Sequence, residues 1–270
     1  MATAHHQFSL NRISSITLRH FYLLRNSFAR LFEIIYWPFL NVVIWGFITQ
    51  FLMTNSSIIA KATGLLLGAV LLWDVFFRSQ LGVAVSLLEE MWSRNLVNLF
   101  ITPLRPYEYL LGLFSIGLLR VLVGVVPAMG LAILFYHYSI FDLGWPMWLF
   151  FVNLMVMGWW FGLVICGMLM RFGLGAENLA WTCIFLLSPV AGIYYPIATL
   201  PEWMQAIAWC LPTAYVFEGM RGLMLNHELS WPLLKGAIWL NIVYMAAGIG
   251  FFLLAFENAR RDGQLLQSGE

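Results

Sequence analysis

Five ionisable side chains lie close together in one stretch of the sequence, residues 87–112, between two long apolar runs. Only 10% of the residues in the chain are charged, so this group stands out from its surroundings. Because ionised side chains are rarely buried, we expect the whole stretch to face water. Carboxylate and guanidinium groups at this density can also form charge-assisted hydrogen bonds with a partner protein. The five residues are Glu89, Glu90, Arg94, Arg105 and Glu108.

Three further charges, Asp74, Arg78 and Arg120, interrupt apolar runs. Asp74 and Arg78 are four residues apart, so they share one helix face and can form an ion pair. Arg120 has no acidic residue one turn away, and we expect it to meet Asp74 from another helix. Charges inside a bilayer usually face a bundle interior or a wet cavity. The sequence leaves open whether these residues line a transport path or fix helix packing.

The residue patterns of familiar catalytic sites are absent from the sequence. The five histidines show no metal-ligand spacing, and there is no HExxH motif and no serine nucleophile elbow. Neither Lys61 nor Lys235 follows a glycine, so the phosphate-binding loop GxxxxGK[ST] is also missing. We therefore expect no catalytic residue, cofactor or metal in this chain. If ATP drives its activity, another polypeptide must hydrolyse the ATP.

The composition indicates a membrane protein. Hydrophobic residues make up 61% of the chain, and the mean hydropathy is +0.82. Soluble domains contain about 45–50% apolar residues, so the excess is expected to face lipid. The formal net charge of +1 gives no basic surface for nucleic acid. Three cysteines make no disulfide framework.

The apolar runs predict an all-α fold with six transmembrane helices. A preceding segment, residues 10–32, places Arg12, Arg19 and Arg30 on one helical face and apolar residues on the opposite face. This pattern is typical of a helix in the membrane interface, with its guanidinium groups toward lipid phosphates. Residues 201–227 are too short to cross twice and predict an outer re-entrant helical hairpin. The six predicted spans are 34–53, 62–88, 109–141, 147–170, 178–200 and 236–256.

The basic residues predict the orientation of the chain. With six spans, nine arginines fall on one side and only Lys61, Arg221 and Lys235 on the other. The positive-inside rule then places both termini in the cytoplasm. The first apolar run starts about thirty residues in, so we expect no cleaved signal peptide. The predicted regions are a cytoplasmic N-terminus (1–32), a transmembrane domain (33–256) with a cytoplasmic loop (88–108), and a cytoplasmic tail (257–270).

Aromatic residues are concentrated near the predicted interfaces, as in the interfacial belts of membrane proteins. Their rings could also stack on the sugar rings of a cargo, and the sequence leaves both interpretations open. The strongest candidates are Trp159, Trp160, Tyr194 and Tyr195.

Three segments, in their order and spacing, resemble the permease subunit of type-2 ATP-binding-cassette (ABC) exporters. The first is 89–112, which resembles the acidic coupling helix of that family followed by Thr102-Pro103. The second runs from Ser188-Pro189 to Trp203. The third is Pro212-Thr213-Ala214-Tyr215 with Glu218 and Arg221, in which Leu211 stands where the family often has asparagine. The resemblance covers essentially the whole chain.

The resemblance implies a half-transporter in the bacterial inner membrane. Two copies, or this chain and a close relative, would form the pathway. Separate subunits that bind ATP and Mg²⁺ would dock under the 89–106 loop and the N-terminal helix. Glu218 and Arg221 would form a clasp at the outer gate. The ATPase-coupling residues would be Glu89, Glu90, Met91, Trp92, Arg94, Leu96, Val97 and Phe100.

The cargo divides into two classes, polysaccharide or glycolipid against hydrophobic drug-like or lipid molecules. A different class of function, an ion-coupled carrier without an ATPase partner, is the alternative. Asp74 is its only support in the sequence.

Overall fold

The computed structural model describes residues 9–55, 60–96 and 105–261 of the chain, and these residues form helices and turns without a strand. These described residues also include three short 3-10 helices, Ile140–Leu143, Gly173–Ala176 and Ile197–Thr199. The α-helices of the described part are α1 (Leu10–Arg25), α2 (Phe28–Asn55), α3 (Ala60–Trp92), α5 (Pro106–Tyr136), α6 (Pro146–Phe172), α7 (Leu179–Leu187), α8 (Glu202–Ala208), α9 (Pro212–Asn226) and α10 (Trp231–Arg261).

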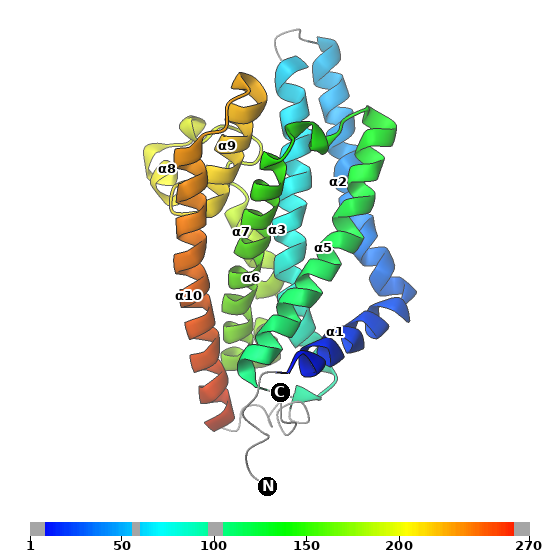
Figure 1. Ribbon diagram of the computed structural model, residues 1–270, viewed down its shortest axis with the longest axis vertical. Helices are drawn as coiled ribbons and strands as arrows, with labels where there is room; N and C mark the ends of the chain where they lie inside the picture. Colours follow the sequence, from blue (N-terminus) through cyan, green and yellow to red (C-terminus); the bar gives the residue numbers. More distant parts are fainter. Residues whose placement is uncertain (1–8, 56–59, 97–104, 262–270) are drawn as a thin grey trace.

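Five long helices make the body of the molecule: α2, α3, α5, α6 and α10 run along its long axis (Figure 1). Within the described residues, these five contain the stretches that are long and apolar enough to cross a membrane. α3 is the central helix, because 89% of its most apolar stretch is buried, against 22% for α2 and α10. The stretches are Phe28–Leu52, Gly64–Trp92, Pro106–Tyr136, Pro146–Ala176 and Trp231–Arg261.

Glycines let α3 approach its neighbours closely. A Cβ atom added to Gly82 would lie 2.5 Å from the Cα of Gly117 in α5. On the α6 side, a Cβ on Gly158 would lie 2.5 Å from the Ser79 side chain, and one on Gly162 would lie 2.7 Å from a valine of α3. Small residues at such contacts bring helix backbones together where lipid supplies no hydrophobic drive for association.

The contact between α6 and α10 contains a buried hydrogen-bond network. Trp160 donates its indole N–H to the Asn241 side chain over 3.0 Å, and Asn241 donates to both the backbone and the side-chain oxygen of Asn153. Trp160 is only 8% exposed. It therefore packs between α6 and α10, while its role in an aromatic belt or in contact with cargo stays a prediction.

The predicted fifth span, 178–200, is not a continuous helix. α7 ends at Leu187 after nine residues, or about 13 Å, whereas a bilayer core is about 30 Å thick. Pro189 follows at once and cannot donate a helical hydrogen bond, and Gly192 adopts a positive φ of 73°. Turns then lead to the hairpin of α8 and α9 at the opposite end of the bundle from α1 (Figure 1). These two short helices occupy the segment expected to form a helical hairpin.

Two other boundaries differ from expectation. The N-terminal helix ends at Arg25, not at residue 32, because α2 begins at Phe28. Pro38 therefore lies in the interior of α2 instead of in its first turn. A proline inside a helix leaves the carbonyl four residues earlier, that of Ile34, without its helical donor.

Candidate functional site

The end of α3 places two carboxylates under α1. α1 lies across the end of the bundle where α5 begins and α10 ends (Figure 1). Its buried stripe is Ile16, His20 and Leu24, spaced four residues apart and so on one face. This stripe faces Glu89 and Glu90, the last acidic residues of α3.

Glu89 is surrounded by three basic side chains. Its Oε1 atom lies 3.1 Å from Nη2 of Arg120 and 3.6 Å from Nε of Arg30. Its Oε2 atom lies 3.3 Å from Nδ1 of His20. The carboxylate side chain is only 8% exposed, so α1, α2 and α5 together compensate a buried charge.

Glu90 is held in a similar way. Its Oε2 atom lies 3.0 Å from Nη2 of Arg19 and accepts a 2.8 Å hydrogen bond from Asn95. Its Oε1 atom lies 3.5 Å from Nε2 of His20. The imidazole ring therefore lies between two carboxylates, and only its doubly protonated form can donate to both.

A third carboxylate, Glu108, fixes the other end of α1. Arg12 binds it through two nitrogens, at 2.6 Å and 2.8 Å. The same carboxylate accepts backbone N–H groups from Ser9 and Arg105, and so caps the start of α5. The hydrogen bond to Glu108 raises the pKa of the Arg12 guanidinium. The two-nitrogen geometry is the strong form of an arginine–carboxylate contact.

These contacts define one assembly, which we name the α1 clamp. It joins α1 to both helices that flank the connection between α3 and α5. Its members are Arg12, Arg19, His20, Arg30, Glu89, Glu90, Glu108 and Arg120.

The α1 clamp corrects two expectations from the sequence. Glu89, Glu90 and Glu108 do not face water, because basic side chains from α1, α2 and α5 neutralise them in the interior. Arg12 and Arg19 point at these carboxylates, while apolar residues of α1 such as Leu10 and Leu18 are exposed. The helix therefore turns its arginines toward the protein.

The remaining candidate coupling residues separate into buried and exposed ones. Met91 and Leu96 are 6% and 4% exposed and belong to the core. Trp92 is 49% exposed, donates its indole N–H to Glu177 over 3.1 Å, and lies next to the exposed turn at Arg94. Arg94 has a left-handed φ of 52°, which ends α3. Val97 and Phe100 lie outside the described residues.

The charged residues of the bundle interior are paired differently from expectation. Arg120 contacts Glu89, so the expected meeting with Asp74 is wrong. Asp74 accepts a 3.1 Å hydrogen bond from Asn41 of α2 instead. Although Asp74 and Arg78 are both buried, the ion pairs of the described part do not include one between them.

At the opposite end, Glu218 and Arg221 of α9 tie the helical hairpin to the turns after α7. Arg221 Nη1 lies 3.1 Å from Glu218, which in turn accepts the backbone N–H of Ile197 over 2.7 Å. The same guanidinium donates through Nη2 to the carbonyls of Gly192, Ile193 and Tyr195. Burial lowers the pKa of Arg221, and Glu218 opposes this effect. The pair therefore supplies hydrogen bonds to non-helical backbone, while its role at a gate stays a prediction.

The aromatic candidates other than Trp160 are partly exposed. Tyr194 stacks on Trp45 of α2, with ring centroids 4.6 Å apart, and Trp159 stacks on Phe114 of α5 at 4.8 Å. Tyr195 donates its hydroxyl to the carbonyl of Pro189. These contacts fix the rings against the protein and do not decide between belt and cargo.

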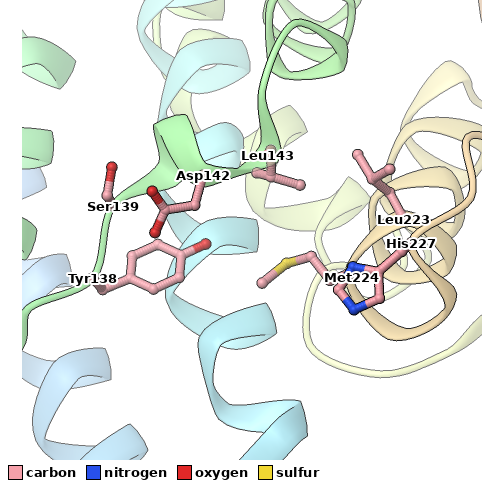
Figure 2. A pocket seen from close by; sticks show the side chains of 7 residues that line it. All are labelled: Tyr138, Ser139, Asp142, Leu143, Leu223, Met224 and His227. Atoms are coloured by element: carbon pink, nitrogen blue, oxygen red, sulfur yellow. The ribbon is translucent and has the colours of Figure 1, made fainter.

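A pocket of about 270 Å³ lies between the α5–α6 connection and the end of α9. Figure 2 shows Tyr138 and Asp142 on one side of it, and Met224 and His227 on the other. Burial raises the pKa of Tyr138. Within the described ranges, no group of three or more His, Cys, Asp or Glu side chains could hold a metal ion.

Sequence reasoning missed His20 and the inward direction of Arg12 and Arg19. The available signal was one of charge: the four arginines at 12, 19, 25 and 30 precede the first predicted span, and three carboxylates, at 89, 90 and 108, flank one connection. Pairing them requires knowing that α1 folds back over both ends of that connection. No local pattern in the sequence contains this information.

The fold and the α1 clamp define a polytopic membrane protein, with long apolar helices and a charged assembly at one end of the bundle. Residues 17–225 match the family model described as "ABC-2 type transporter", and the chain therefore belongs to this family of transporter membrane domains. The match extends from α1 to α9 and includes the Glu218–Arg221 pair and every member of the clamp except Arg12. No curated protein matches the chain. The chain is thus an integral membrane permease domain, with five candidate spans in the part that the structure describes. It has no ATPase activity of its own, and its family implies an ATPase partner.

Proposed function

We propose that this chain is the permease subunit of an ABC-type exporter in a bacterial inner membrane. Two copies form the substrate path, and separate subunits that bind ATP and Mg²⁺ drive it. Membership of the ABC-2 type transporter family supports this proposal. In it, the five long helices cross the bilayer, and α7 with the turns after it makes a sixth, broken crossing.

The orientation in this proposal has both ends of the chain in the cytoplasm. α1 and the end of α10 lie at the same end of the bundle, which supports an even number of crossings (Figure 1). Basic residues are concentrated there: Arg12, Arg19 and Arg25 in α1, and Arg260 and Arg261 at the end of α10. Such residues favour the cytoplasmic side of a membrane.

The α1 clamp is the observation that carries the coupling part of the proposal. Glu89 and Glu90 precede the α3–α5 connection and Glu108 follows it, and each binds a basic side chain of α1. Force applied to this connection therefore acts on α1, α3 and α5 together. A unit of packed elements that moves as one body is a common way to transmit a switch.

The docking surface for the ATPase consists of the exposed residues beside the clamp. Trp92 and Arg94 are the described members of this surface. Val97 and Phe100 are further members of this surface, which we propose on the basis of the sequence alone. Exposed tryptophan and arginine are the residue types most enriched among interface hot spots.

At the outer end, the Glu218–Arg221 clasp holds α9 against the turns after α7 and so controls cargo exit. The proposal admits the two cargo classes, polysaccharide or glycolipid and hydrophobic drug-like or lipid molecules. A transport assay with one representative of each class decides between them.

The test is co-purification of the full chain with its candidate ATPase subunit, followed by an ATPase assay in proteoliposomes. Trp92→Ala should weaken the complex by about tenfold or more, because hot-spot tryptophans commonly contribute about 2 kcal/mol or more. Trp203→Ala is the matched control, because Trp203 is 66% exposed and lies in α8 at the opposite end. It should leave the complex unchanged.

Two results would overturn the proposal. One is a well-folded chain that binds no ATPase subunit while a proton gradient drives transport, which would favour the ion-coupled carrier. The other is equal binding by the wild-type chain and the Trp92→Ala variant, which would exclude the proposed docking surface.

A further inference from the structure

A partly enclosed cavity of about 240 Å³ lies between α2, α3, α5 and α7, which supply all of its lining residues. Three arginines and two glutamates line it together with apolar and tryptophan side chains, so its ionisable groups carry a net charge of one positive unit. This is an unusual lining for a cavity inside a bundle of apolar helices. The charged residues are Arg30, Glu33, Arg78, Glu89 and Arg120.

The hydrogen-bonding capacity of this cavity is not used up by the protein. Glu89 is occupied by Arg30, Arg120 and His20. Arg78, however, is 4% exposed, and its Nε and Nη2 atoms have no hydrogen-bond partner among the described residues. The Nε atom of Arg120 also has no hydrogen-bond partner among the described residues. Buried donors without partners are costly, so a group that accepts hydrogen bonds is expected to fill the space between them.

Local packing keeps Arg78 in this position. Its side chain lies against Gly124 of α5, where an added Cβ atom would come within 3.4 Å of both Cδ and Nε. The carbonyl of Ile34, which Pro38 leaves without its helical donor, lies against the same glycine. The neighbouring acid, Asp74, accepts the Asn41 hydrogen bond at Oδ1, and its buried Oδ2 atom has no hydrogen-bond partner among the described residues. It lies one helical turn from Arg78, but no ion pair joins the two side chains in the described part of the chain.

The size and lining of the cavity indicate the ligand class. Pockets that hold whole drug-sized molecules are typically about 300–1,000 Å³, so a cavity of about 240 Å³ fits a small head group. A guanidinium presents parallel N–H donors that match phosphate oxygens. The rim contains Trp92, 49% exposed, and the half-buried Trp181, which suit an apolar tail.

We propose that this cavity binds the phosphate-type anionic head of an amphiphile, with Arg78 as the principal donor and Arg120 as the second. The head group could belong to an anionic membrane lipid or to a free phosphorylated molecule, and the chemistry of the site is the same for both. The proposal concerns binding by this chain alone. It therefore stands or falls independently of the ATPase partner and of transport.

The experiment measures binding to the purified full chain with two probes. Native mass spectrometry counts phosphatidic acid bound from mixed micelles, with phosphatidylcholine as the uncharged comparison. Calorimetry measures binding of inorganic pyrophosphate. Arg78→Gln should lower the affinity for the probe that binds by about tenfold or more, since it removes charge-assisted hydrogen bonds. Arg171→Gln, at an exposed arginine outside the cavity, should change it less than about twofold.

Two further variants test whether a loss of affinity comes from the missing guanidinium and not from misfolding. Arg78→Lys keeps the charge without the planar fork and should give an intermediate affinity. Val85→Phe narrows the cavity and leaves every arginine in place, so it should weaken binding as Arg78→Gln does. Circular dichroism and gel filtration confirm that each variant is folded.

The two probes separate the sources of the head group. Arg78-dependent binding of phosphatidic acid alone assigns the site to a membrane lipid, and Arg78-dependent binding of pyrophosphate assigns it to a free phosphorylated molecule. Binding of neither probe, or equal binding by the wild-type chain and Arg78→Gln, overturns the proposal. The ATPase subunit takes no part in these measurements, so a negative result here leaves the proposed coupling function untouched.

Discussion

A double-mutant cycle on Glu89 and Arg120 tests the central contact of the α1 clamp. The two side chains are 8% and 9% exposed, and Glu89 Oε1 lies 3.1 Å from Arg120 Nη2. At an effective dielectric constant of about 20, two unit charges at this separation attract by about 5 kcal/mol. Arg30 and His20 still face Glu89 when Arg120 is removed, so we expect each single variant, Glu89→Gln or Arg120→Gln, to cost about 3 kcal/mol.

The double variant should cost clearly less than the sum of the two single variants. Removing both charges leaves no uncompensated ion, so the coupling free energy should be about 2 kcal/mol or more. The measurement is unfolding in mixed micelles, with the fraction of denaturing detergent increased stepwise and helix content followed by circular dichroism. Each variant is compared with the wild-type chain at the same lipid content.

A second cycle supplies the control and the refutation. Asp74→Asn combined with Arg120→Gln should be additive within about 0.5 kcal/mol, because Asp74 contacts Asn41 and not Arg120. Additive Glu89 and Arg120 variants would show that the contact does not stabilise the fold. Coupling between Asp74 and Arg120 would show that Arg120 points into the bundle and not toward Glu89.

Three further predictions concern other parts of the chain. Glu218→Ala should reduce cargo export more than ATP hydrolysis in proteoliposomes, because it frees the turn that Glu218 binds at the outer end; equal loss of both activities would contradict the gate role. Gly82→Ala should destabilise the protein by about 1–3 kcal/mol, because its Cβ would lie 2.5 Å from the backbone of α5. Gly130→Ala is the control for this variant, because an added Cβ would have nothing within 4 Å, and it should stabilise the protein by up to about 1 kcal/mol. Detergent unfolding measures both variants. Equal changes in the free energy of unfolding would exclude the close approach of α3 and α5. Asn241→Ala should lower the free energy of unfolding by about 0.5–2 kcal/mol in the same assay, because the indole N–H of Trp160 loses its hydrogen-bond acceptor. An unchanged free energy of unfolding would mean that water accepts the hydrogen bond instead.

The long apolar helices could be predicted from the sequence because their signal is local. Length and hydropathy alone identify α2, α3, α5, α6 and α10, and the turn chemistry of Pro189 and Gly192 marks where the next helix ends. These breaks were expected within the fifth span, 178–200, but the helix before them is only nine residues long. A nine-residue α7 followed by turns does not differ enough in composition from an apolar span.

The candidate site could be predicted less completely, because its partners are far apart in the sequence. The acidic residues of the stretch 87–112 were expected to face water, whereas they are buried in the structure. Glu108 and Arg12 are separated by 96 positions, and Glu89 and Arg120 by 31. Their pairing depends on the rotation of each helix about its axis and on how α1 returns to the bundle, which hydrophobic periodicity does not specify.

The α1 clamp also implies an order of events during synthesis. α1 leaves the ribosome before α3 and α5, yet its acidic partners are encoded at positions 89, 90 and 108. At a translation rate of about 5–20 residues per second, several seconds separate the two. During that interval the arginines of the nascent helix have only water and lipid head groups to bind. α1 therefore completes its native contacts only after helices that are made later, and its docking reports that α3 and α5 have already been inserted.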